Sequence, residues 1–270
     1  MSAIASAAQN ESPMLVLGGR APQLRWGQGS LQEIDHVPFV APLARSAATA
    51  GSADEIPGLI DCAFAAALGP RSGPAFVDFP LDVVFSQGVL ADAAPAAVAP
   101  GPIAPGAGIE RAADALAEAE RPVIMAGTGL YWGRGEQALR ELAEALRIPV
   151  FLNGLGRGCL PADHELFFSR ARGTALGGAD VALIIGVALD FRLGFGAAFG
   201  EDARLIVVDV AAPVRAHPRP VHAKLYGDVS STLKALSSTR ARPHEDWIAS
   251  LRASETERRA AERDELREDR

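Results

Sequence analysis

Apolar stretches alternate with helical patterns along most of this chain. Residues 122–126 and 181–185 are continuously apolar, which is typical of parallel strands buried on both faces of a sheet. Between them, residues 136–146 place leucine and alanine one helical turn apart and charged residues on the other side. This spacing predicts a helix that covers the sheet with one face. The same reasoning predicts a helix at 109–119 and further strands at 149–152 and 205–208.

The alternation of strands and helices predicts the fold class of the larger part of the chain. Residues 108–238 are expected to form an α/β domain with a doubly wound parallel sheet, that is, a Rossmann-like domain. The tail at 239–270 is rich in interspersed Arg, Glu and Asp. We expect an exposed helix or a linker there, with Trp247 and Leu251 anchoring its start.

A shorter α/β segment precedes this domain. Apolar residues at 13–19 and 73–80 predict two buried strands, and 52–68 predicts a helix that Ser52 could cap. Two strands and one helix form only part of a layer, so residues 1–86 are expected to be a partial α/β layer that needs partners. Residues 87–107 are rich in Ala, Gly and closely spaced Pro, which predicts an interdomain linker.

Composition disfavours several classes of protein. The 270 residues are 49% hydrophobic and carry a formal net charge of -7, so the chain can bury a substantial core but offers no basic surface for nucleic acid or an anionic membrane. No apolar run approaches the roughly 18 residues that a membrane span requires. Cys62 and Cys159 lie far apart in the sequence, which argues against a disulfide and favours a reducing cytoplasm.

Candidate chemistry lies where the predicted strands end, because open parallel sheets bind ligands at the carboxyl ends of their strands. The glycine-rich loop after 122–126 could bring backbone amides to a phosphate, although any tight strand-to-helix turn also needs glycine. The later loops could hold a flat ligand, and their acidic side chains could bind a ribose or merely cap a helix. The candidate cofactor-binding residues are Gly127, Thr128, Gly129, Asn153, Gly154, Leu155, Gly186, Val187, Asp190, Asp209, Val210 and Asp228.

Two other kinds of site find little support. A nicotinamide cofactor would favour an acidic residue after the second strand of the domain, to bind a ribose hydroxyl, but that position is Asn153. The histidines show no paired spacing with one another or with a cysteine, so no independent metal site is predicted. These histidines are His36, His164, His217, His222 and His244.

Three segments carry a resemblance to a known family. They are GQGSLQEIDHVPF at 27–39, GPAFVDFPLDV at 73–83 and DFR at 190–192. Together they resemble the thiamine diphosphate enzymes of the acetolactate synthase type, which include acetolactate synthase-like 2-hydroxyacyl-CoA lyases. The resemblance implies that residues 1–86 are the C-terminal part of a pyrimidine-binding domain and that 108–238 are the central domain. Residues 239–270 would then lead toward a diphosphate-binding domain.

The resemblance also suggests two catalytic residues. By it, Gln32 approaches the thiazolium end of thiamine diphosphate or the substrate entrance, and Arg192 reaches toward the entrance of the active site. Simpler readings stay open for the neighbouring charges. Asp190 and Arg192 could pair only with each other, and Glu33 could pair with a nearby arginine.

Cofactors follow from the same resemblance. It implies thiamine diphosphate and Mg²⁺ in the full-length enzyme, with the activating glutamate upstream of the residue matching Met1 and the metal motif beyond Arg270. We therefore expect the isolated chain to be inactive. FAD is disfavoured because Ala188 stands where FAD-binding members usually carry arginine, whereas ADP or the adenosine part of CoA is still an option for the central domain.

Three functions compete at this point. The favoured one is part of a thiamine diphosphate-dependent carboligase or decarboxylase that acts on 2-ketoacids, with a 2-hydroxyacyl-CoA lyase as its alternative and a homo-oligomer as the expected assembly. The second is a non-catalytic module that binds an adenine nucleotide. The third is an NAD(P)-dependent oxidoreductase, which rests only on the Rossmann-like pattern and ranks last.

Overall fold

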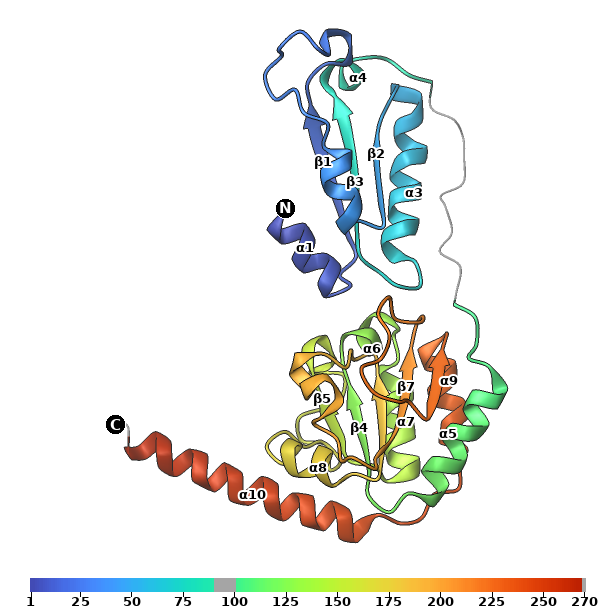
Figure 1. Cartoon of the computed structure of the whole chain (residues 1–270), viewed down its shortest axis with the longest axis vertical. Coiled ribbons are helices and arrows are strands. Elements are labelled where there is room, and N and C mark those ends of the chain that lie inside the picture. The colour runs from blue at the N-terminus through green and yellow to red at the C-terminus, as the bar shows by residue number, and fades with distance from the viewer. Residues whose placement is uncertain (90–100, 269–270) are drawn as a thin grey trace. The chain divides into compact units, whose positions relative to one another are not determined.

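The computed structural model describes residues 1–89 and 101–268. The chain divides into two compact units, Met1–Pro100 and Gly101–Arg270, whose elements are labelled in Figure 1. Each unit holds one sheet, and the paired strands of both sheets run parallel. The predicted α/β fold class with parallel sheets is therefore confirmed.

The first unit is built on a three-stranded sheet. Its order is β1 (Met14–Arg20), β3 (Pro74–Pro80) and β2 (Ser46–Thr49), and helix α3 (Ile56–Leu68) packs against it. The strands predicted at 13–19 and 73–80 are confirmed to within a residue. Strand β2 escaped prediction because the sequence Ser-Ala-Ala-Thr has no apolar run. The unit also contains α1 (Ser2–Gln9), α2 (Val37–Val40) and α4 (Leu81–Val84).

The start of α3 differs from its prediction. The helix was expected from Ser52, but it begins at Ile56 after a 3₁₀ turn, η3 (Ala53–Glu55), and Ser52 makes no capping hydrogen bond with its side chain. The carboxylate of Glu55 instead accepts the backbone N–H of Gly51 at 2.9 Å. A proline in the first turn suits this later start, because its fixed φ is already helical and it has no N–H to satisfy.

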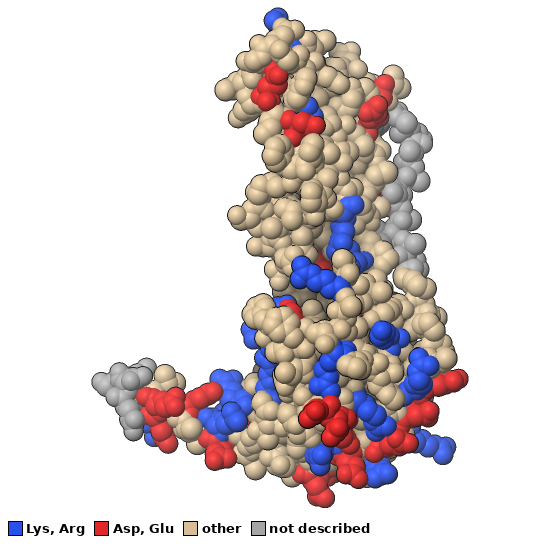
Figure 2. Space-filling model, in the orientation of Figure 1, with Lys and Arg blue, Asp and Glu red and all other residues tan. Residues whose placement is uncertain are grey.

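Much apolar surface of the first unit is uncovered. Leu24, Leu31 and Phe85 are 80% or more exposed, and charged side chains are sparse on the face of this unit shown in Figure 2. Both outer strands of the sheet, β1 and β2, have one open edge within the described residues, and open edges favour association with other chains. These features agree with the expectation that the segment needs partners, which stays a prediction.

The second unit is built on a five-stranded sheet. Its order is β5 (Val150–Leu152), β4 (Pro122–Ala126), β6 (Val181–Ile185), β7 (Arg204–Asp209) and β8 (Ala223–Tyr226). The chain runs from β4 outward to β5 and then returns past β4 to β6. This reversal creates the switch point of a doubly wound sheet, where ligands usually bind. Strands β4 and β6 are buried along their whole length, as their continuous apolar sequences predict.

Helices cover this sheet. Helix α7 (Glu136–Leu146) has the predicted bounds and contacts α9 (Val229–Ser237), which also contacts α5 (Gly106–Glu118). Helix α8 (Arg172–Gly178) contacts α10 (Glu245–Glu268), the long helix that ends the chain in Figure 1. Helix α5 begins three residues earlier than predicted, inside the predicted linker 87–107. Most of that linker falls at 90–100, outside the described residues.

Strand β8 and helix α8 are among the elements of the second unit that were not predicted. Strand β8 is only Ala-Lys-Leu-Tyr, a short alternating sequence that pairs with β7 at the edge of the sheet. Helix α8 has the sequence Arg-Gly-Thr-Ala-Leu-Gly-Gly, and its glycines have low intrinsic helix propensity. Both elements are stabilised by tertiary contacts that the local sequence does not reveal.

Helix α10 is docked to the second unit by its first half. The carboxylate of Glu255 accepts the backbone N–H groups of Ser169, Arg170 and Ala171 at 3.1, 2.6 and 2.8 Å, at the start of α8. The indole of Trp247 donates to the carbonyl of Pro122, and Leu251 is fully buried. The prediction that the apolar residues anchor this helix is confirmed, whereas the role of Glu255 was not foreseen.

The cysteines are free, as predicted. Cys62 is exposed and Cys159 is half-buried. Burial, together with the charge of Glu136, raises the pKa of the Cys159 thiol to about 11. Among the helices of the described residues, none combines the length and the apolar character that crossing a membrane would need.

Truncation of a core leucine tests the predicted face of α7. Leu142 is fully buried, so Leu142→Ala should lower the free energy of unfolding by about 2–5 kcal/mol through lost contacts and a cavity. Chemical denaturation followed by circular dichroism measures this loss. Glu141→Ala, at an exposed position of the same helix, is the control and should change stability by less than about 0.5 kcal/mol. Equal effects of the two changes would contradict the assigned orientation of α7.

The docking of α10 should depend on pH. Burial opposes the ionisation of Glu255, but the hydrogen bonds from Ala171, Ser169 and Arg170 outweigh it and hold the pKa of this carboxyl below its ordinary 4.5. A lowered pKa in the folded state means that the carboxylate stabilises the fold above pH 4.5 and that this contribution is lost as pH falls below that value.

Glu255→Gln should remove this dependence. The variant should lose about 1–3 kcal/mol at pH 7, because its amide presents an NH₂ group to backbone donors, and should lose less at acidic pH. Thermal unfolding between pH 3 and pH 7 measures both effects, with the exposed Glu257→Gln as the matched control. If the stability difference between Glu255→Gln and the unaltered chain were the same at pH 3 and at pH 7, the docking role of the ionised carboxyl would be refuted.

Candidate functional site

The loops at the carboxyl edge of the five-stranded sheet come together around two glycines. Helix α6 (Thr128–Trp132) begins directly after β4, and its Gly129 donates its N–H to the carbonyl of Gly186, the residue after β6, at 2.9 Å. A Cβ on Gly186 would lie 2.4 Å from Cα of Gly129, and Gly186 also has a φ of +58°. The switch point of the sheet is thus closed by direct contact between two backbone segments.

Because the two segments lie so close together, amides that could otherwise bind a phosphate donate to backbone carbonyls instead. Gly127 donates its N–H to the carbonyl of Ile185 at 3.0 Å, and the Gly129 amide is bound as described above. A helix N-terminus attracts phosphate through N–H groups that lack intrahelical partners. These two glycines therefore fit the tight-turn interpretation better than the phosphate-binding one.

The loop after β5 joins the same edge. The Oδ1 atom of Asn153 accepts the N–H of Gly154 at 2.8 Å, and the N–H of Leu155 points to the hydroxyl of Thr128 at 3.4 Å. A Cβ on Gly127 would meet the side chain of Val187 at 2.6 Å. The candidate residues from the first three strand ends are therefore brought together, as the sequence predicted.

The last two strand ends carry aspartates with local hydrogen bonds. One carboxylate oxygen of Asp209 accepts the N–H of Val210 at 2.8 Å, and it would lie 3.2 Å from a Cβ on Gly129. Asp209 thus belongs to the same edge as the glycine pair. Asp228 accepts the N–H of Ser231 at 2.7 Å and caps α9, which is the structural role that the sequence left open for it.

Asp190 and Arg192 pair with each other. They lie at the start of η5 (Phe191–Gly196), where the Asp190 carboxylate accepts the backbone N–H of Arg192 at 2.9 Å and its guanidinium at 2.6 Å. Burial opposes the ionisation of Asp190, but the hydrogen bonds from Arg192 outweigh it and lower the pKa of the carboxyl. The same bond raises the pKa of Arg192. This arrangement matches the simpler reading of the pair, and a catalytic role of Arg192 stays a prediction.

Gln32 lies in an exposed loop of the first unit. Its φ is +61°, which is uncommon for a residue other than glycine. The neighbouring Glu33 accepts the N–H groups of Gly27, Gly29 and Ser30 at 2.8, 3.2 and 3.1 Å. The sequence left open a pairing of Glu33 with an arginine. In the structure the Glu33 carboxylate instead binds these backbone amides and so holds the loop in shape.

A buried carboxylate secures this loop to the sheet of the first unit. Asp78 of β3 is fully buried, and its Oδ2 atom lies 3.1 Å from Nδ1 of His36 and 3.7 Å from the guanidinium of Arg20. Arg20 also donates to the hydroxyl of Thr49 at 2.9 Å and stacks over Trp26. Asp78 was not predicted as a site residue because residues 73–80 have the pattern of a buried apolar strand. A lone carboxylate inside such a strand was the signal that could have revealed it.

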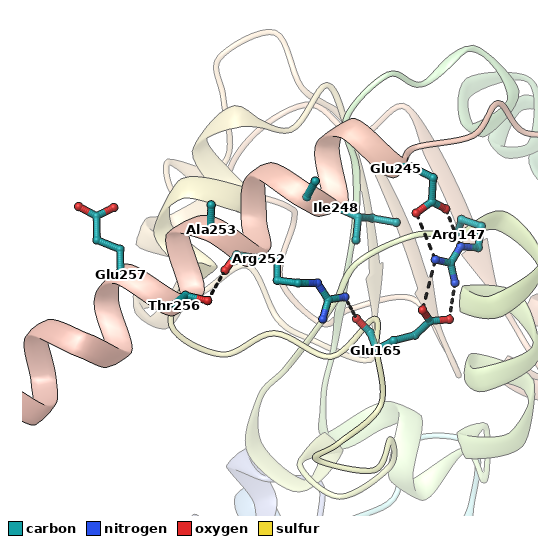
Figure 3. A pocket seen from close by; sticks show the side chains of 9 residues that line it. Arg147, Glu165, Glu245, Ile248, Arg252, Ala253, Thr256 and Glu257 are labelled. Atoms are coloured by element: carbon teal, nitrogen blue, oxygen red, sulfur yellow. Dashed lines mark hydrogen bonds and ion pairs between the residues drawn. The ribbon is translucent and has the colours of Figure 1, made fainter.

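A pocket lined by ion pairs lies away from the carboxyl edge of the five-stranded sheet. Figure 3 shows a pocket of about 700 Å³ between α10 and the turn after α7. Arg147 pairs there with Glu245 at 2.8 Å and with Glu165 at 2.5 Å, and these bonds, the one to Glu245 first, raise the pKa of Arg147. Arg147 directly precedes the region where β5 begins, so this pocket lies at the amino end of that strand. Its ion pairs fasten the start of α10.

Comparison with known proteins identifies the second unit. Residues 109–236 match the family model described as "Thiamine pyrophosphate enzyme, central domain". This range covers the five-stranded sheet and ends in α9. The chain belongs to the thiamine pyrophosphate enzyme family. Thiamine pyrophosphate is the cofactor named thiamine diphosphate above, so the resemblance noted in the sequence is confirmed.

Similarity to individual proteins of this family extends over the whole chain. The chain is 56% identical over 277 residues to a probable acetolactate synthase of Mycobacterium bovis, and equally to the acetolactate synthase large subunit of Mycobacterium tuberculosis. Each alignment covers 100% of this chain and 50% of the relative. A 2-hydroxyacyl-CoA lyase of Oryza sativa subsp. japonica is 31% identical over 251 residues, which cover 88% of this chain and 43% of the lyase. The chain spans about half the length of the curated relatives it matches.

The described residues alone do not supply the groups that would hold the diphosphate and the metal ion of the cofactor of this family. Within residues 1–89 and 101–268, no group of three His, Cys, Asp or Glu side chains is placed to hold a metal ion. The amides of Gly127 and Gly129, which could have faced a diphosphate, donate to backbone carbonyls. The candidate features among the described residues are the closed edge of the five-stranded sheet in the second unit and the exposed loop that contains Gln32 in the first unit.

Substitution of Gly186 tests the contact at the switch point. Gly186→Ala should destabilise the second unit by at least about 2 kcal/mol, because the new Cβ would clash with Gly129 in a backbone conformation that favours glycine. Thermal and chemical unfolding measure the loss. Gly173→Ala in α8 is the control, since a Cβ there meets nothing within 4 Å, and it should be neutral or stabilise by up to about 1 kcal/mol. Similar unfolding curves for the two variants would rule out the close contact.

Proposed function

We propose that this chain forms part of a thiamine diphosphate-dependent carboligase that acts on 2-ketoacids, in the manner of an acetolactate synthase. The observation that carries the proposal is the 56% identity to two acetolactate synthases over the entire chain. The 2-hydroxyacyl-CoA lyases match at 27–31% identity over 77–98% of the chain. A lyase acting on 2-hydroxyacyl-CoA is therefore the second candidate.

Each unit takes a part in this proposal. The first unit corresponds to the C-terminal part of a pyrimidine-binding domain, in which the loop fixed by Glu33 presents Gln32 toward the reacting end of the cofactor. The second unit is the central domain, with Arg192 at the entrance of the active site. The loop geometry supports the assignment of Gln32, since three amides bound to Glu33 restrict this exposed segment.

The rest of the machinery is assigned to polypeptide outside this chain. The activating glutamate and the ligands of Mg²⁺ would belong to the half of the relatives that the chain does not match. The chain alone is accordingly proposed to be inactive, and a cytoplasmic homo-oligomer is the proposed form of the full-length enzyme. The free cysteines support a reducing compartment.

An adenine nucleotide is a further proposed ligand of the central domain. ADP or the adenosine part of CoA would bind along the carboxyl edge, where Asp209 lies beside Gly129. FAD is disfavoured, because Ala188 is exposed at the position where an arginine would be expected. Binding of ADP without turnover by the isolated chain is expected both for the carboligase proposal and for a non-catalytic module, so only activity of a completed enzyme separates the two.

Assays of the isolated chain and of a chimera test the function. The isolated chain with pyruvate, thiamine diphosphate and Mg²⁺ should form no acetolactate. A chimera in which this chain replaces the matching half of the Mycobacterium tuberculosis enzyme should form it, measured after acid conversion to acetoin. Acetolactate formation by the isolated chain would contradict its proposed inactivity. A chimera that folds but cleaves only 2-hydroxyacyl-CoA substrates would defeat the carboligase proposal.

Within the chimera, Gln32 should matter more than its loop neighbour. Gln32→Ala should lower kcat/KM for pyruvate at least about tenfold, the loss expected when one hydrogen bond to a charged group is removed at the reacting centre. Gln28→Ala, also exposed in the same loop, is the matched control. Equal kinetics for the two variants would remove Gln32 from the catalytic machinery.

A further inference from the structure

A second pocket of the central domain is bordered by arginines. It has a volume of about 1050 Å³ and lies between the end of β5, the segment after it and the second half of α10. Pockets for small molecules usually have volumes of roughly 300–1,000 Å³, so this one has room for an organic ligand. None of the candidate cofactor-binding residues at the sheet edge lines it. Its charged lining residues are Arg157, Arg170, Arg172, Arg258, Arg259, Glu262 and Glu265.

The base of this pocket is apolar. Leu152, Pro161 and Phe167 line it with surface that is still accessible. Beneath them, Phe151, Leu160 and Phe168 belong to the core of the domain. The rings of Phe151 and Phe168 lie 6.0 Å apart. Such a surface can cover the organic part of a ligand, while the arginines above it contact a charged end.

Two of the five arginines are already neutralised by partners. Arg170 pairs with Glu262 at 3.0 Å, and Arg259 pairs with Glu255 at 2.9 Å. Arg157, Arg172 and Arg258 form no ion pair with the described residues of the chain. Counting Glu255, which pairs with Arg259, beside the lining residues Glu262 and Glu265, five arginines stand against three carboxylates, which leaves two positive charges in excess.

Two of the unpaired arginines, Arg157 and Arg172, influence each other through their like charges. Arg172 is fixed in place because it donates to the backbone carbonyl of Arg192 at 3.0 Å. Burial, and after it the like charge of Arg157, lowers the pKa of Arg172. Guanidinium groups kept close without an intervening carboxylate repel each other, and an anion between them would relieve this repulsion.

We propose that this pocket binds a small organic phosphate, with Arg157, Arg172 and Arg258 as ligands of the phosphate and the phenylalanine base beneath its organic part. A phosphate monoester carries about -1.5 to -2 charges at pH 7, which matches the excess of two positive charges better than a single carboxylate does. The planar fork of a guanidinium also fits phosphate oxygens in pairs. The pocket begins at the carboxyl end of β5, but none of the candidate cofactor-binding residues lines it, and the proposal does not depend on the proposed carboligation.

Calorimetry on the whole chain with phenyl phosphate tests the site. Phenyl phosphate should bind saturably, more tightly than inorganic phosphate because it also covers the apolar base, and more tightly than benzoate, which has one charge. Raising the salt concentration should weaken binding, since exposed charges are screened. Absence of saturable binding overturns the proposal, as does benzoate binding as tightly as phenyl phosphate.

Substitutions locate the binding. Arg157→Gln and Arg172→Gln should each raise the dissociation constant for phenyl phosphate about tenfold or more, the effect of one lost hydrogen bond to a charged group. The side chain of Arg157 makes no hydrogen bond within the described residues, and its backbone bond to Gly154 does not depend on the side chain. The Arg157→Gln variant therefore keeps the test valid if Arg172→Gln unfolds. Arg111→Gln, an exposed arginine of α5 outside the pocket, should bind as the unaltered chain does. An equal loss in Arg111→Gln, or no loss in Arg157→Gln with its unfolding temperature unchanged, would place the phosphate elsewhere.

Discussion

The second unit depends on one contact between two segments of backbone. Gly129 at the start of α6 and Gly186 after β6 approach so closely that neither position accommodates a side chain. The contact joins the ends of β4 and β6, the two strands between which the chain changes direction. It leaves the amides of Gly127 and Gly129 bound to backbone carbonyls, so these two amides are not available to a ligand at this edge.

Most regular elements could be predicted because burial leaves a clear pattern in the sequence. Strands β4 and β6 are buried on both faces and read as continuous apolar runs, while α7 buries a single face and shows helical spacing. Strand β2, strand β8 and helix α8 lack such patterns, since they consist of small, alternating or glycine-rich residues. Their conformations come from pairing and packing with other elements, which a local pattern does not record.

The candidate site was predicted in location but not in its contacts. The loops after β4, β5 and β6 meet because the carboxyl ends of parallel strands share one edge, and this follows from strand order alone. The partner of each polar side chain depends on tertiary structure instead. Glu33 binds backbone amides rather than an arginine, and Asp78 is buried beside His36 and Arg20 from distant parts of the chain. Such partners become visible only once the fold brings them together.

The attachment of α10 through its first half has a mechanical consequence. From Glu255 to Glu268 the helix extends for roughly 20 Å at 1.5 Å per residue, and side chains along most of this stretch are exposed. A rotation of about 10° at the point of attachment would displace the far end by roughly 3 Å, as a lever arm does. A small adjustment around one carboxylate would thereby be amplified along the second half of α10.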